Sequence, residues 1–195
     1  MQNDDISISI ILPTLNEIEN LKILIPEIVE VLKSQNIKDF EIIVVDDNSD
    51  DGTETFINTL SEENRKIKII VRSDIKSLPK SIYEGILHSS KSYVMWLDAD
   101  GSMDSSSVEK LIIEQKKDRD SVIVGSRFVE GGGYKGLEKD RKLGIIQYIR
   151  KISNSEDSVL AIYLSKYFNK LISTLTNIGV NDICLLYTSD AADEV

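Results

Sequence analysis

The sequence predicts an α/β fold in which a mostly parallel sheet carries helices on both faces. Short β-rich apolar runs alternate along the chain with segments of helical periodicity. Such alternation favours parallel strands joined by right-handed crossover helices. Acidic residues also follow several of the apolar runs directly, at the point where each run ends. A chain of 195 residues is long enough to bury a substantial core in one domain.

Five apolar runs, each bounded by turn-forming residues, are typical of strands. They cover residues 6–12, 40–45, 67–71, 93–97 and 121–125.

Helical periodicity is clearest after the first strand, where apolar residues from Ile18 to Leu32 recur on one helical face. Pro26 lies inside this pattern, so we expect it to kink or restart the helix. Further helices are predicted over residues 53–60, 78–90, 105–117, 144–152 and 158–175.

The composition excludes several classes of function. A net charge of −10 and a pI near 4.7 argue against nucleic acid as a partner. No stretch reaches the ~20 apolar residues of a membrane span, and the polar start of the chain does not resemble a signal peptide. Because the chain is acidic overall, an anionic ligand would need a metal ion or local basic residues to hold it.

Carboxylates end three of the predicted strands. Asp98 and Asp100 follow the fourth strand, Asp46 and Asp47 the second, and Glu17 the first. Parallel strands bring their carboxyl ends to one edge of the sheet, where open α/β sheets bind ligands. An isolated D-x-D is most often a solvated turn, but three converging strand ends favour a divalent cation such as Mg²⁺ or Mn²⁺ that holds a diphosphate. The chain lacks G-x-G-x-x-G and a P-loop, which argues against hydride transfer and P-loop nucleotide hydrolysis.

Four sequence motifs together resemble those of one known enzyme family. PTLNE, VVDDNSDDGT, LDADGS and VGSRFVEGG occur in this order, and together they resemble family 2 glycosyltransferases, within them the dolichol-phosphate mannosyltransferase branch. The resemblance covers roughly residues 8–183 and implies a GT-A-like nucleotide-sugar-binding fold. The chain departs from the branch at residues 78–80, where G-L-G is usual, and at residues 101–104, where L-S-H-P is usual.

The resemblance implies roles for individual residues. The predicted nucleotide-sugar-binding residues are Pro13, Leu15, Glu17, Val45, Asp47, Asp98, Ala99, Asp100 and Arg127. Of these, Val45 and Asp47 match the pair that recognises the nucleoside. Asp98, Asp100 and Ser102 would hold the metal, and Asp98, Asp100 and Arg127 are the predicted catalytic residues. Arg127 would contact the diphosphate or the acceptor phosphate, because its planar guanidinium suits phosphate oxygens. Asp182 matches an aspartate that precedes an S-G-F segment in the family.

The implied activity is inverting, metal-dependent transfer of a hexose, with mannose favoured, from a GDP- or UDP-sugar to a polyprenyl phosphate. The implied cofactor is Mg²⁺ or Mn²⁺, and the implied location is the cytoplasmic face of a membrane. Three alternatives stay open. The enzyme could use a different sugar or acceptor, or the chain could be a fragment that binds nucleotide-sugar without turnover. It could also be a haloacid-dehalogenase-like phosphohydrolase, because LDADGS resembles the D-x-D-G-[TS] motif of those enzymes.

The last twelve residues, 184–195, follow no periodicity and resemble a translated sequencing adapter. We therefore expect a truncated catalytic domain over 1–183 and a non-native tail over 184–195.

Overall fold

The computed structural model describes residues 6–103, 105–125, 167 and 174. The chain divides into two compact units, Met1–Ser121 and Val122–Val195, and all the elements below belong to the first. Four strands make one parallel sheet in the order β3-β2-β1-β4. They are β1 (Ile8–Thr14), β2 (Phe40–Asp46), β3 (Ile67–Val71) and β4 (Tyr93–Trp96). The predicted parallel α/β architecture is confirmed.

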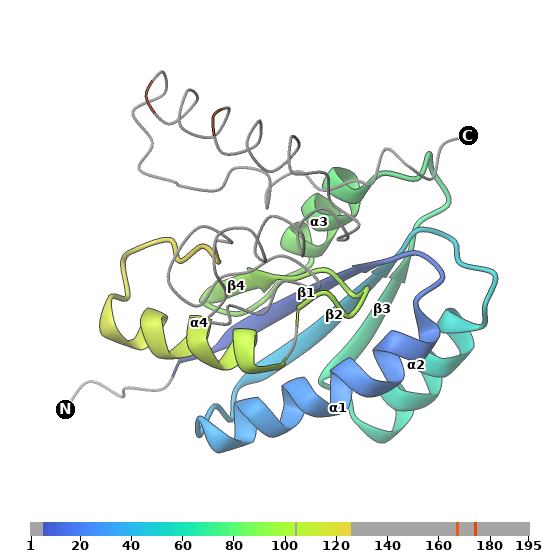
Figure 1. The fold of residues 1–195 in the computed structure, drawn as a ribbon. Coiled ribbons are helices and arrows are strands. Elements are labelled where there is room, and N and C mark those ends of the chain that lie inside the picture. Colours follow the sequence, from blue (N-terminus) through green and yellow to red (C-terminus); the bar gives the residue numbers. More distant parts are fainter. Residues whose placement is uncertain (1–5, 104, 126–166, 168–173, 175–195) are drawn as a thin grey trace, which may run out of the picture. The chain divides into compact units, whose positions relative to one another are not determined.

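Four helices connect and follow these strands. They are α1 (Ile18–Ser34), α2 (Thr53–Glu63), α3 (Leu78–Leu87) and α4 (Ser105–Lys117). Helices α1, α2 and α4 cover one face of the sheet, whereas α3 lies on the other (Figure 1). The prediction of helices on both faces is therefore confirmed.

The core lies mainly between the sheet and α1, α2 and α4. Alternate residues of β1 and β2, such as Ile10 and Ile42, are fully buried against Leu21, Ile28 and other side chains of α1. These strands are buried on both faces, which explains their nearly continuous apolar sequences. Removal of this apolar surface from water is the main favourable term for the fold.

One predicted helix break and one predicted strand do not form. Helix α1 runs uninterrupted through Pro26, so the expected restart is wrong, while the alternative of a kink at Pro26 stays a prediction. Pro26 lies on the exposed side of the helix, so the carbonyl of Lys22 that loses its helical partner can bond to water instead. No strand forms over residues 121–125, where Val122 is 89 % exposed, because a strand requires a hydrogen-bonded neighbour and the four-stranded sheet does not include this segment.

The predicted helices over 144–152 and 158–175 lie outside the described residues, apart from Tyr167 and Thr174, which are helical. Within the described part of the chain, none of the helices is long and apolar enough to cross a membrane.

Candidate functional site

The candidate site lies at the carboxyl edge of the sheet. Because all four strands are parallel, the loops that follow β1, β2, β3 and β4 start at this one edge. Pro13 pairs with Val45 in the β1–β2 register, and β1 also pairs with β4, whose chain continues into Asp98. The structure thus brings the predicted residues of the first three motifs to neighbouring strand ends.

The loops after β1 and β2 are joined by hydrogen bonds. The Asn16 N–H donates to Ser49 Oγ over 2.8 Å, and the Asp50 N–H donates to Asn16 Oδ1 over 3.0 Å. The Asp47 N–H donates to the carbonyl of Thr14 at 2.9 Å. Asn16 has a φ of 57°, a left-handed conformation that asparagine tolerates better than most residues. These hydrogen bonds therefore hold the two loops together.

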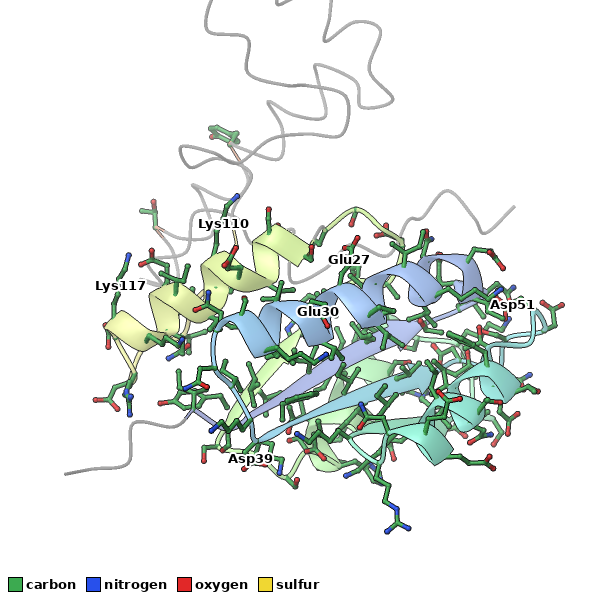
Figure 2. The ribbon with its side chains drawn as sticks, turned by 90° about the horizontal axis from the view of Figure 1, so that it is seen from below. Glu27, Glu30, Asp39, Asp51, Lys110 and Lys117 are labelled. Carbon is green, nitrogen blue, oxygen red and sulfur yellow. The ribbon has the colours of Figure 1, made fainter. Side chains whose placement is uncertain are left out.

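Asp51 caps two helices at once. Its Oδ2 accepts from the Ile18 N–H of α1 at 2.9 Å, and its Oδ1 accepts from the Thr53 N–H of α2 at 3.0 Å and from Thr53 Oγ1 at 2.7 Å. Figure 2 shows Asp51 at the end of the molecule where both helices begin. Burial raises the pKa of Asp51, but the hydrogen bonds from Thr53 and Ile18 outweigh it and lower the pKa. The carboxylate thus satisfies N–H groups that helix starts leave unpaired.

Asp47, a predicted nucleoside contact, lies in a buried polar cluster. Its Oδ1 pairs with the Arg72 guanidinium, and its Oδ2 accepts from the Ser77 N–H at 2.9 Å. Arg72 also donates to Ser81 Oγ at 2.9 Å. Asp47 and Arg72 are each less than 9 % exposed. This cluster ties the loop between β3 and α3 to the end of β2.

Sequence reasoning did not find Arg72 and Ser77. The only signal was an arginine directly after the third strand, at the edge where the carboxylates gather. The same edge holds one buried polar atom without a partner in the described residues, the hydroxyl oxygen of Thr14. The Val45 side chain is fully buried with Ile11 and Ile43, so it contributes to the core.

The loop that carries D-x-D is more open. Asp98 is half-buried, Ala99 is buried, and Asp100 and Ser102 are exposed. Asp100 Oδ1 accepts from the Ser102 N–H at 2.7 Å, and the Gly101 between them has a φ of +73°, a conformation that glycine adopts without strain.

This loop approaches the start of α1. A Cβ at Gly101 would lie 3.3 Å from Asn20 Oδ1, and Asn20 Nδ2 donates to Glu17 Oε2 at 2.5 Å. Glu17 is half-buried, and the neighbouring Leu15 is 38 % exposed. The predicted residue Glu17 is therefore linked through Asn20 to the D-x-D loop.

The residues present fit a hard divalent cation only in part. Carboxylate oxygens such as those of Asp98 and Asp100 are the ligands that Mg²⁺ and Mn²⁺ prefer. In the described ranges, however, no three acidic, histidine or cysteine side chains gather closely enough to hold a metal ion. A cation here would need further ligands from phosphate oxygens and water, as Mg²⁺ commonly has. The predicted residues Arg127 and Asp182 lie outside the described residues.

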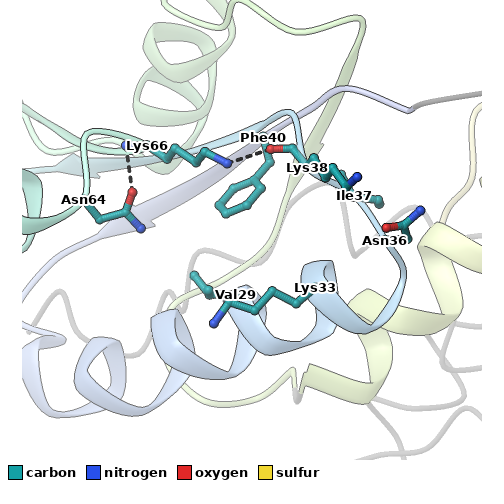
Figure 3. A pocket seen from close by; sticks show the side chains of 8 residues that line it. All are labelled: Val29, Lys33, Asn36, Ile37, Lys38, Phe40, Asn64 and Lys66. Carbon is teal, nitrogen blue, oxygen red and sulfur yellow. Dashed lines mark hydrogen bonds between the residues drawn. The ribbon is translucent and has the colours of Figure 1, made fainter. Parts of the chain in front are cut away.

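A cavity of about 450 Å³ lies at the opposite edge of the sheet, among the residues drawn in Figure 3. Phe40 and Ile37 contribute apolar surface, and the Lys66 ammonium lies 4.3 Å from the centre of the Phe40 ring while donating to the Lys38 carbonyl at 2.6 Å. The cavity is lined by Val29, Lys33, Asn36, Ile37, Lys38, Phe40, Asn64 and Lys66. None of the predicted site residues lines it.

The profile of Glycosyl transferase family 2 matches residues 9–182. The chain belongs to this family. It is a glycosyltransferase domain, and the GT-A-like fold expected of the family agrees with the parallel sheet described above.

Two dolichol-phosphate mannosyltransferases are among its curated relatives. The chain is 35 % identical over 136 residues to the one from Pyrococcus furiosus, a match that covers 70 % of this chain and 37 % of that protein. It is 30 % identical over 135 residues to the one from Saccharomyces cerevisiae, covering 69 % of this chain and 49 % of that protein. A third relative, the GalNAc(5)-diNAcBac-PP-undecaprenol beta-1,3-glucosyltransferase of Campylobacter jejuni, is 26 % identical over 170 residues, covering 83 % of this chain and 50 % of that protein. The matched stretch thus spans half or less of each relative.

Solved structures give weaker matches. Mannosyltransferase PcManGT from Pyrobaculum calidifontis, in complex with GDP-Man and Mn²⁺, is 21 % identical with a TM-score of 0.44, over 49 % of this chain and 28 % of that one. S. aureus TarS 1-349 in complex with UDP-GlcNAc is 19 % identical with a TM-score of 0.46, over 63 % of this chain and 38 % of that one.

Proposed function

We propose that this domain transfers a hexose, with mannose from GDP-mannose as the leading donor, to a polyprenyl phosphate with inversion at the anomeric carbon. The observation that carries the proposal is the convergence of the PTLNE, VVDDNS and LDADGS loops at one edge of the sheet. Similarity to two dolichol-phosphate mannosyltransferases supports mannose as the transferred sugar and a lipid phosphate as the acceptor. Similarity to the C. jejuni glucosyltransferase keeps other sugars and acceptors as candidates.

The residues at this edge of the sheet would have different roles in binding the donor. The linked loops that carry Pro13, Leu15 and Asp47 would bind the nucleoside, and Arg72 would hold the Asp47 carboxylate in place. Asp98 and Asp100, with Ser102 beside them, would hold the divalent cation. When bound, this cation supplies positive charge that stabilises the departing nucleoside diphosphate. Arg127 would contact a phosphate group through its guanidinium.

The acceptor explains why a general base is not needed. A phosphate monoester has a second pKa near ~6, so its oxygen carries negative charge at pH 7 and can attack directly. In the proposed step this oxygen forms a bond to the anomeric carbon, and the bond from that carbon to the diphosphate oxygen breaks. The bonding electrons leave with the nucleoside diphosphate. A single displacement of this kind inverts the anomeric configuration. The site would lie at the cytoplasmic face of a membrane, where such an acceptor is held.

The test is to measure GDP and UDP affinity by calorimetry with and without Mn²⁺, and transfer of labelled mannose from GDP-mannose to a polyprenyl phosphate. Asp100→Asn should abolish the dependence of nucleotide affinity on Mn²⁺ and lower transfer by about 100-fold or more. Asp39→Asn is the matched control, because it changes an exposed carboxylate at the opposite edge of the sheet (Figure 2). Asp39 pairs there with Lys91. Unchanged transfer by Asp100→Asn would contradict the proposed site.

A second candidate is nucleotide-sugar binding without turnover, for which the hydrogen-bonded loops after β1 and β2 would suffice. It predicts metal-dependent binding of GDP or UDP in the same calorimetry, with no transfer to any polyprenyl phosphate.

A further inference from the structure

Helix α3 and the loop before it carry several exposed apolar side chains. Ile75 is 80 % exposed, Tyr83 61 %, Leu87 60 % and Ile86 44 %. Four of the twelve exposed large hydrophobic side chains in the described ranges thus come from one stretch of thirteen residues. Exposed apolar groups that gather in this way mark an interaction surface, whereas single ones do not.

The three of these residues that belong to α3 share one side of the helix with Pro79. Pro79, Tyr83, Ile86 and Leu87 follow the i, i+4, i+7, i+8 spacing of a helical face. The opposite side, with Ser81 and Gly85, is buried against the sheet. We call the set Ile75, Pro79, Tyr83, Ile86 and Leu87 the α3 stripe. Its helical residues lie on the side of α3 opposite the buried Ser81 and Gly85. Helix α3 itself lies on the face of the sheet opposite α1, α2 and α4 (Figure 1).

Lysines accompany the α3 stripe. Lys76 and Lys80 are exposed, and neither side chain has a hydrogen bond or ion pair with any residue of the described ranges. Glu84, on the same helix, lies 3.6 Å from His88 Nδ1, and the exposed Asp74 precedes the α3 stripe. Lysine stems that extend past apolar residues, together with a tyrosine, are the chemistry of helices that lie at a lipid interface.

The α3 stripe begins next to the candidate site. The Ser77 N–H donates to Asp47 Oδ2 at 2.9 Å, and Ser77 lies between Lys76 and the first turn of α3. A polyprenyl phosphate stays embedded in a membrane, so the site that uses it must reach the membrane surface. Within the first compact unit, the α3 stripe is thus an exposed apolar surface that adjoins the loop after β2.

We propose that the α3 stripe binds the surface of an anionic lipid bilayer and so brings the carboxyl edge of the sheet to a membrane-held acceptor. Tyr83 and Leu87 enter the boundary between headgroups and acyl chains, and Lys76 and Lys80 contact lipid phosphates. This inference rests on the proposed lipid phosphate acceptor, and it adds the surface through which the domain meets the lipid.

The test is sedimentation of the full chain with vesicles of phosphatidylcholine and phosphatidylglycerol. The double variant Tyr83→Ser/Leu87→Ser should bind these vesicles about tenfold more weakly or worse, because it removes apolar surface from the contact. Lys76→Gln/Lys80→Gln should weaken binding about fivefold or more and remove its dependence on phosphatidylglycerol. Ile23→Ser, at a 62 % exposed position of α1 on the other face of the sheet, is the matched control and should bind as the unchanged chain does.

Several outcomes would overturn the inference. They are an unchanged chain that does not sediment with the vesicles, equal loss in Ile23→Ser, and full binding by both double variants. A change in molar mass by light scattering on Tyr83→Ser/Leu87→Ser, without a change in vesicle binding, would identify a second copy as the occupant and would also overturn it. Calorimetry with GDP separates this inference from the proposed function. If nucleotide binding and transfer to a short-chain prenyl phosphate persist while vesicle binding fails, only the inference about the α3 stripe is wrong.

Discussion

The two faces of the sheet are stabilised differently. On the face covered by α1, α2 and α4, a continuous aliphatic core surrounds residues such as Ile10, Leu12 and Ile28. On the face covered by α3, few of the described apolar residues are fully buried, with Ile11, Ile43 and Val45 at their centre. The second face instead buries a charged residue, Glu41, which is 3 % exposed. One face therefore depends on apolar burial, and the other depends on hydrogen bonds and close packing.

Glu41 connects four segments of the second face. Its Oε1 accepts from Ser9 Oγ at 2.6 Å, from the Ser90 N–H at 2.6 Å and from Ser90 Oγ at 2.9 Å, while its Oε2 pairs with Lys68 Nζ at 2.6 Å. A buried carboxylate is tolerated only when its oxygens are satisfied in this way. On the second face, where aliphatic contacts are sparse among the described residues, the hydrogen bonds of Glu41 stabilise the packing instead. We call Glu41 and its partners Ser9, Lys68 and Ser90 the polar hub.

The largest expected effect is on the aliphatic face. Ile28→Ala should lower the free energy of unfolding by about 2–5 kcal/mol, because it leaves a cavity among side chains that cannot fully collapse. Ile28 is 0 % exposed, whereas Ile23 on the same helix is 62 % exposed. Ile23→Ala should therefore change stability little, and urea denaturation of both variants measures the contrast. Equal losses would mean that the aliphatic core does not dominate this face.

The second prediction concerns pH and the polar hub. Burial raises the pKa of Glu41, but the hydrogen bonds from Lys68, Ser9 and Ser90 outweigh it and lower the pKa from 4.5 to about 2. Because the folded pKa is depressed, this stabilisation is present above pH 4.5 and is lost as the pH falls from 4.5 to about 2. It corresponds to roughly 3 kcal/mol.

Urea denaturation between pH 2 and pH 7 tests this prediction. In Glu41→Gln the stability at neutral pH should be lower, and the difference from the unchanged chain should shrink as the pH falls through that range. Glu27→Gln, at an exposed site of α1, is the control and should keep the full pH dependence. A difference that does not vary with pH would show that Glu41 is not the titrating group.

The third prediction tests the close approach of α3 to the sheet. A Cβ at Gly85 would clash with Ile11 Cγ2, so the helix or the strand would have to shift. Gly85→Ala should therefore destabilise the fold by about 1–3 kcal/mol, although alanine normally favours a helix over glycine. A double-mutant cycle with Ile11→Ala should show strong coupling, because the second change removes the clash. Additive effects in thermal unfolding would place the strain elsewhere.

The smallest expected effect is at the start of α1 and α2. Asp51→Ala removes the acceptor that serves both helix N-termini and should cost about 0.5–2 kcal/mol. Asp50→Ala is the matched control, since Asp50 is exposed and contributes only its N–H to the loop. Chemical denaturation of the two variants measures the difference. An equal cost for Asp50→Ala would contradict the double-cap interpretation.

Local sequence patterns predicted most helices and strands, because apolar periodicity and turn-forming residues depend only on residues that are close in the chain. The prediction for residues 67–71 and for residues 105–117 matches β3 and α4. Strand β1, however, extends to Thr14, past the predicted end at Leu12. Pro13 is tolerated there because pairing of β1 with β4 ends at Ile11 and Trp96, so the missing N–H removes no bond to β4. The register with a distant strand decided this boundary.

The sequence by itself determined the order of strands and helices, the carboxylates that end three strands, and membership of the glycosyltransferase family. Only the tertiary structure decided which groups the buried and half-buried carboxylates bind. Asp51 bonds to Ile18, Asp47 pairs with Arg72, and Glu41 bonds to Ser90, at separations of 33, 25 and 49 residues. Hydrogen bonds between groups so far apart in the chain leave no local periodicity or propensity signal, because they form only when the sheet brings the strands together.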